Sequence, residues 1–75
     1  MGKLHPMADK LLLEICKAYS RTGSTKMFVA DITSEEFDDS FYIELDNAGY
    51  ITFHNTVAPN VEVLDRTIAL AKKLI

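Results

Sequence analysis

The sequence predicts one small α+β domain with three main helices and a small antiparallel β-sheet. Three observations predict it. Apolar residues recur at helical spacing near both ends and in the middle of the chain, short runs of β-branched and aromatic residues separate these stretches, and 75 residues suffice for only one domain. Nearly half of the residues are apolar, which excludes an intrinsically disordered chain.

The first predicted helix spans about residues 7–20 and ends before Gly23, a residue suited to a left-handed C-terminal cap. On a helical wheel its apolar side chains share one broad face, made up of Met7, Ala8, Leu11, Leu12, Ile15, Cys16, Ala18 and Tyr19. Leu13 lies outside this arc. Residues 1–6 precede the periodic pattern, and Met7 stands where it begins, so residues 1–6 are expected to be a loose leader or a remnant of cloning.

A short strand, one helical turn and a longer helix are predicted next. Residues 27–29 favour a strand, and residues 30–32 leave room for one helical turn at most. Thr33 and Glu36 match a T-x-x-E capping box, which predicts a helix over residues 34–48. Its core-facing stripe would be Phe37, Phe41, Leu45 and Ala48.

A β-hairpin and a last helix complete the predicted domain. Residues 50–55 and 61–64 alternate in the manner of strands, and the TVAPN turn joins them. The last helix spans about residues 65–75 and is expected to bury Ile68, Ala71, Leu74 and Ile75. Its exposed side would carry Arg66, Lys72 and Lys73.

This order of elements matches a winged helix-turn-helix whose second helix is cut down to one turn. In the phrase LDNAGYI a helix ends at a glycine and an aromatic-aliphatic pair opens the hairpin, or wing. The segment DITSEEFDDSFYIELDNAGYITF resembles the corresponding part of small winged-helix proteins of Gram-positive bacteria and prophages, the YjcQ-like group. The resemblance implies a cytoplasmic, non-catalytic protein with a regulatory role. The alternative fold is a different small α/β arrangement, in which the helix over residues 33–48 packs flat on a three-stranded sheet.

Signals for catalysis, metal binding or membrane insertion are weak. His5 and His54 have no cysteine or histidine neighbour at ligand spacing, and GSTK at residues 23–26 lacks the pattern of a phosphate-binding loop. Cys16 is interpreted as a small packed hydrophobe, and a single cysteine excludes an internal disulfide and favours a reducing compartment. No apolar run is long enough to span a membrane. We expect no cofactor and no enzymatic activity.

Charge is divided unevenly along the chain. Residues 27–65 contain nine acidic residues and no lysine or arginine, whereas both ends are net basic. A winged helix normally inserts the helix before the wing into the DNA major groove. Here the predicted solvent side of that helix carries the acidic and polar set Glu35, Glu36, Asp39, Tyr42, Ile43, Asp46 and Asn47. Those carboxylates would repel phosphate, so conventional insertion is disfavoured.

The sequence therefore leaves three hypotheses for function. The first is a phage- or prophage-type regulator of transcription that binds DNA through its basic residues Lys10, Lys17, Arg21, Lys26, Arg66, Lys72 and Lys73. The second is a protein-interaction module or antagonist that binds its partner through the acidic set and could act as a DNA mimic. Ile43 would be the apolar centre of that contact. A two-fold homodimer could also pair basic ends with acidic centres. The third, an enzyme or metal protein, has the least support.

Overall fold

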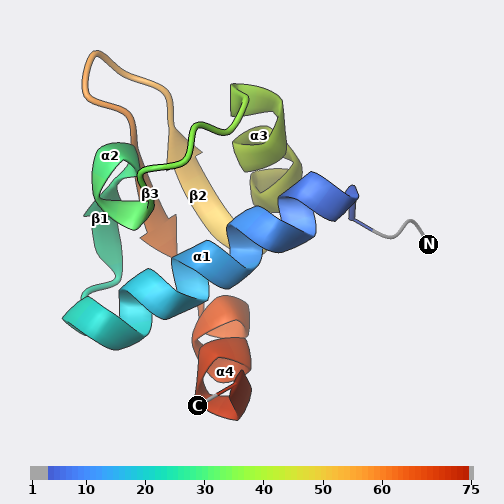
Figure 1. Ribbon diagram of the computed structural model, residues 1–75, viewed down its shortest axis with the longest axis vertical. Coiled ribbons are helices and arrows are strands. Elements are labelled where there is room, and N and C mark those ends of the chain that lie inside the picture. Colours follow the sequence, from blue (N-terminus) through green and yellow to red (C-terminus); the bar gives the residue numbers. More distant parts are fainter. Residues whose placement is uncertain (1–3, 75) are drawn as a thin grey trace.

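The computed structural model describes residues 4–74 and has four helices and one three-stranded antiparallel sheet. The predicted α+β class is confirmed. The elements in chain order are α1 (Pro6–Thr22), β1 (Lys26–Phe28), α2 (Val29–Ile32), α3 (Asp39–Asn47), β2 (Ile51–His54), β3 (Asn60–Val63) and α4 (Asp65–Leu74). The strands lie in the order β1-β3-β2. In Figure 1, α1 crosses one face of the sheet, and it packs against both α3 and α4.

Helix α1 begins one residue before the predicted start and ends at Thr22. The Nδ1 atom of His5 accepts a hydrogen bond from the Met7 backbone N–H at 3.1 Å, and Pro6 occupies the first turn, where its missing N–H costs nothing. Gly23 closes the helix with φ of 71°, as predicted, and its N–H donates to the Tyr19 carbonyl at 2.7 Å.

Part of the predicted leader belongs to the packed domain. Leu4 packs against the hydrophobic core, and the backbone N–H of His5 donates to the Glu44 carboxylate at 2.7 Å. The ring of His5 also lies 5.0 Å from that of Phe41. The loose leader predicted for residues 1–6 is therefore wrong for residues 4–6, because a helix cap and an aromatic contact hold them; residues 1–3 lie outside the described residues.

The core is built on the predicted apolar face of α1. Leu11 and Ile15 are fully buried there, in one cluster with apolar residues of α3 and the sheet that include Leu45, Ile51 and Val61. Cys16 is buried in the same cluster, and this burial raises the pKa of its thiol above the ordinary value. A buried thiol with a raised pKa is a poor nucleophile, which agrees with its interpretation as a packed hydrophobe.

Helix α3 starts five residues later than predicted. Thr33 is extended, and its hydroxyl accepts a hydrogen bond from the Glu35 N–H at 3.1 Å in a local turn, so the predicted capping box does not form. The cap is Asp38 instead, whose carboxylate accepts a hydrogen bond from the Ser40 N–H at 3.0 Å. Residues 33–38 consequently form a loop between α2 and α3, and Phe37 is only half-buried.

On each edge of the sheet, a side chain satisfies outward backbone groups of one residue. On the β1 edge, the Ser24 hydroxyl donates to the Lys26 carbonyl at 2.8 Å and accepts from the Lys26 N–H at 3.3 Å. On the β2 edge, the Phe53 N–H donates to the Asp46 carboxylate at 2.8 Å. These contacts satisfy backbone groups that would otherwise be open to pairing with another chain.

The last helix differs from the prediction at its end. Ala71 is buried and Ile68 is half-buried, but the predicted burial of Leu74 is wrong, because this residue is 54% exposed in the last turn of α4. Ile75 lies outside the described residues. The helix is anchored instead by Thr67, which is fully buried and whose hydroxyl donates to the Tyr50 carbonyl at 2.6 Å.

Candidate functional site

Tyr42 anchors α3 to the sheet. Its side chain is only 2% exposed, and its ring stacks on that of Phe53 with centroids 5.1 Å apart. Burial raises the pKa of the Tyr42 phenol, and the nearby Asp39 carboxylate raises it further. The prediction that Tyr42 faces solvent is therefore wrong. Its ring belongs to the interior and cannot read base edges or contact a partner.

Two carboxylates of α3 stabilise the fold. Asp46, predicted to contact a partner, is half-buried and accepts the hydrogen bond from the Phe53 backbone. Glu44 accepts the hydrogen bond from the His5 backbone. Each carboxylate satisfies a backbone donor that no strand or helix pairs, and hydrogen bonds to charged acceptors are stronger than neutral ones. Part of the acidic character of α3 therefore has a structural cause, and Asp46 is removed from the candidate partner-binding set.

The exposed face of α3 is narrow. Asp39, Ile43 and Asn47 are all exposed and recur at a spacing of four residues, which places them in one row along the helix. Ile43 is 46% exposed, as predicted from the helical wheel. We call Asp39, Ile43 and Asn47 the α3 face. It carries one negative charge, one large apolar side chain and one amide, and it has no cation.

The predicted residues Glu35 and Glu36 lie before α3, in the loop over residues 33–38. The Glu35 carboxylate forms a salt bridge of 2.9 Å with the Lys10 ammonium of α1, and both side chains are about half exposed. Glu36 is exposed and forms no salt bridge within residues 4–74. Because exposed ion pairs contribute little to stability, the salt bridge with Lys10 restrains this loop only weakly.

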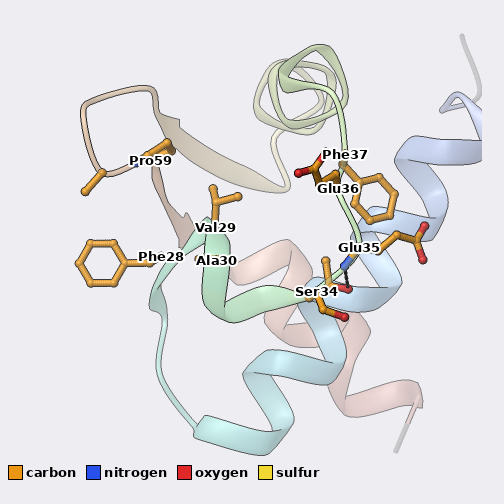
Figure 2. A pocket seen from close by; sticks show the side chains of 10 residues that line it. Phe28, Val29, Ala30, Ser34, Glu35, Glu36, Phe37 and Pro59 are labelled. Atoms are coloured by element: carbon orange, nitrogen blue, oxygen red, sulfur yellow. Dashed lines mark hydrogen bonds between the residues drawn. The ribbon is translucent and has the colours of Figure 1, made fainter.

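This loop forms one wall of a groove that the sequence did not predict. The groove has a volume of about 620 Å³ and lies between the loop, the start of α2 and the turn that joins β2 to β3 (Figure 2). Its lining includes Phe28, Val29, Glu36 and Pro59. Phe28 is 53% exposed, since it follows Lys26 and the buried Met27 in a strand whose side chains alternate between the two faces. This alternation in the sequence could have indicated that the aromatic residue at the end of β1 is exposed.

The candidate basic residues belong to α1, β1 and α4 and none belongs to α3, and four of the seven have partners. Lys10 pairs with Glu35, and Lys17 pairs with Glu14 at 3.7 Å. The Arg21 guanidinium donates to the Asp31 carbonyl at 3.3 Å.

Arg66 has the most extensive contacts of the seven. Its guanidinium donates to the Ala48 carbonyl at 2.7 Å and lies 4.2 Å from the centre of the Tyr50 ring. It thereby ties the end of α3 to α4, which is a structural role. Lys26, Lys72 and Lys73 are exposed and form no salt bridge in the part of the chain that the structure describes.

Within residues 4–74 no group of three or more histidine, cysteine, aspartate or glutamate side chains is arranged to hold a metal ion. No helix in the same range combines the length and apolar character needed to cross a membrane. Comparisons with protein families, with curated proteins and with solved structures returned no match.

Proposed function

We propose that this chain is a winged-helix module that binds another protein, and that the α3 face forms part of the contact. The order of elements through β3 supports the winged-helix assignment, as does the sheet order β1-β3-β2, in which the first strand pairs with the last. In this arrangement α3 is the helix before the wing, and β2 and β3 form the wing. The one-turn α2 stands in the place of a full second helix.

The observation that carries the proposal is electrostatic. From Met27 to Asp65, a stretch that contains α3 and the whole wing, the chain has no lysine or arginine. Binding to duplex DNA gains most of its affinity when cationic side chains displace counterions from phosphates. A helix and wing without cations have no source of that free energy, and the carboxylate of Asp39 adds repulsion.

The α3 face has the composition of a small protein interface. Ile43 provides an exposed apolar centre, and Asp39 and Asn47 flank it along the helix. Interfaces commonly have an apolar centre with a polar rim, and a few central residues carry most of the binding energy. Replacement of Ile43 by lysine should therefore abolish binding without changing the fold.

The test is partner capture from extracts of cells that produce the protein, with immobilised wild type, Ile43→Lys and Leu13→Lys. Leu13 is the matched control, because it is a comparably exposed apolar residue on a helix, at 39% against 46% for Ile43. We expect one protein to be recovered at stoichiometric levels by wild type and Leu13→Lys and to be lost with Ile43→Lys. Equal recovery by all three would remove the α3 face from the contact.

The second candidate is a regulator of the phage or prophage type that binds DNA through its basic residues. It is favoured by the exposure of Lys26, Lys72 and Lys73, which are not held by salt bridges within residues 4–74. In this mode α3 would face away from the duplex. Substitution of these three lysines by glutamine should then weaken DNA binding and flatten its dependence on salt, whereas Asn47→Ala should leave it unchanged.

A further inference from the structure

The groove beside the 33–38 loop is not filled by any segment of residues 4–74. Its three walls are the start of α2, the loop before α3 and the wing turn, and the wing turn is distant from the other two in the sequence. Its volume of about 620 Å³ lies within the range of ligand-sized sites, roughly 300–1,000 Å³.

One side of the groove is apolar. Phe28, Val29, Ala58 and Pro59 line it, and Phe28 is more than half exposed. Val57, next to the lining residue Ala58 in the wing turn, is fully exposed. A small domain gains nothing from leaving a phenylalanine and a neighbouring valine in water, and clusters of exposed apolar groups commonly mark interaction sites.

The other side of the groove carries negative charge. Of its lining residues only Glu35 and Glu36 are charged. Glu35 is already paired with Lys10, whereas Glu36 forms no salt bridge within residues 4–74. Figure 2 shows Glu36 and Val29 extending toward the space between the loop and the wing turn, and Glu35 extending away from it. An occupant of the groove therefore meets an apolar wall and one carboxylate that lacks a counter-charge.

We infer that the groove holds a short segment of a partner protein in which a lysine or arginine lies next to a large apolar side chain. The cation pairs with Glu36, and the apolar side chain covers Phe28, Val29 and Pro59. Charge complementarity decides this chemistry. Residues 27–65 contain carboxylates and no lysine or arginine, so they would repel an acidic segment or a nucleic acid. The inference rests on the proposed protein-binding function and adds a second contact, distinct from the α3 face.

The test begins with selection of a displayed library of random peptides on the immobilised chain. The enriched peptides should combine a lysine or arginine with a neighbouring large apolar residue. A fluorescein-labelled synthetic copy of an enriched peptide is then titrated with wild type and variants by fluorescence anisotropy. Far-UV circular dichroism and thermal unfolding establish that each variant is folded.

Charge and apolar contact are tested by separate pairs of variants. Glu36→Lys should weaken peptide binding about tenfold or more, whereas Asp39→Lys, an identical reversal outside the groove, should change it less than about twofold. Phe28→Ser should weaken binding by a similar factor, and Ile43→Ser, which removes a comparably exposed apolar side chain on α3, should not.

Several results would overturn the inference. One is the enrichment of peptides that contain no lysine or arginine. Another is that the selection enriches no peptide. A third is that Glu36→Lys and Asp39→Lys weaken peptide binding equally, which would mean that the peptide is attracted only by the net charge of the protein. If Ile43→Ser but not Phe28→Ser abolishes binding, the α3 face stands as the protein-binding surface and the groove assignment fails.

Self-association is measured in parallel by sedimentation, because Lys73 and the exposed Leu74 at the end of α4 have the chemistry expected of the occupant. A dimer that Glu36→Lys dissociates would make the occupant a second copy of this chain and would overturn the assignment to a separate partner. A monomer at the concentrations of the peptide titration agrees with that assignment.

Discussion

Replacement of Tyr42 by alanine tests the position of α3 on the sheet. The Tyr42 ring is almost completely buried and stacks on Phe53. Truncation of a buried large aromatic to alanine costs about 3–5 kcal/mol of the free energy of unfolding. A chain of this length has a free energy of unfolding of about 4–11 kcal/mol in total, at roughly 0.05–0.15 kcal/mol per residue. Tyr42→Ala should therefore remove about a quarter or more of the stability, and it should unfold the protein if the wild type lies at the low end of this range.

The matching variants separate burial of the ring from other effects. Tyr42→Phe retains the ring and its stacking and removes only the hydroxyl, so it should stay within about 1.5 kcal/mol of wild type. Ile43→Ala, at the next position but 46% exposed, should stay within about 0.5 kcal/mol. Urea denaturation followed by circular dichroism gives the free energy of unfolding of all three variants. The dependence of that free energy on urea concentration should be the same in each.

The result that refutes this reasoning is a Tyr42→Ala variant within about 1 kcal/mol of wild type, since a buried ring cannot be removed so cheaply. Tyr42 would then be on the surface, as the helical wheel had predicted. It would also return to the set of side chains that could contact a nucleic acid or a partner.

Two further predictions concern the groups around this contact. Asp46→Ala should cost about 1–3 kcal/mol, because it leaves the Phe53 N–H without its acceptor, whereas the exposed Asp39→Ala should cost under about 0.5 kcal/mol in the same urea assay. The raised pKa of Tyr42 implies that the unfolded chain loses its phenolic proton first, so this contribution to stability is complete below the ordinary pKa of 10.0 and is lost as the pH rises above it. In a Cys16→Ala background, which removes the thiol whose pKa is also raised, the fall in Tm above about pH 10 should be steeper with Tyr42 than with Tyr42→Phe, and parallel curves would contradict it.

Sequence patterns predicted the helices and strands whose bounds are set by residues close to them in the sequence. The apolar face of α1 follows from helical spacing, and its end follows from Gly23, whose backbone takes the left-handed conformation. The single turn of α2 and the two hairpin strands, β2 and β3, also lie within one or two residues of the predicted bounds. In each case a cap, a turn residue or an alternation of side chains lies within the element itself.

The start of α3 could not be decided from the sequence, because two caps compete. Thr33 and Asp38 are both good N-cap residues, and each hydrogen-bonds a nearby backbone N–H in the structure. Only the one at Asp38 begins a helix. Phe37, which this start leaves in the loop, packs against the core from there, and that contact is not visible in the spacing of residues 33–48.

The single apolar stripe predicted for α3 also proved insufficient. The helix packs against α1 on one side and β2 on another, so residues outside the stripe are buried as well. The groove also depends on contacts between segments distant in the sequence, since it joins residues 28–37 with the turn between β2 and β3 at residues 58–59. Its walls are set by the sheet register, in which Phe28 pairs with Asn60.

We propose that α3 is too anionic to enter a DNA groove. The most direct measurement is a fluorescence anisotropy titration of a labelled mixed-sequence duplex at low salt, with wild type and Asn47→Ala. Non-specific DNA-binding proteins have dissociation constants of about 1–100 µM even at physiological salt. The account predicts no saturable binding through about 100 µM, or weak binding that is identical in the two proteins. Saturable binding at low micromolar concentration that Asn47→Ala weakens about tenfold would place α3 on the bases and contradict the claim.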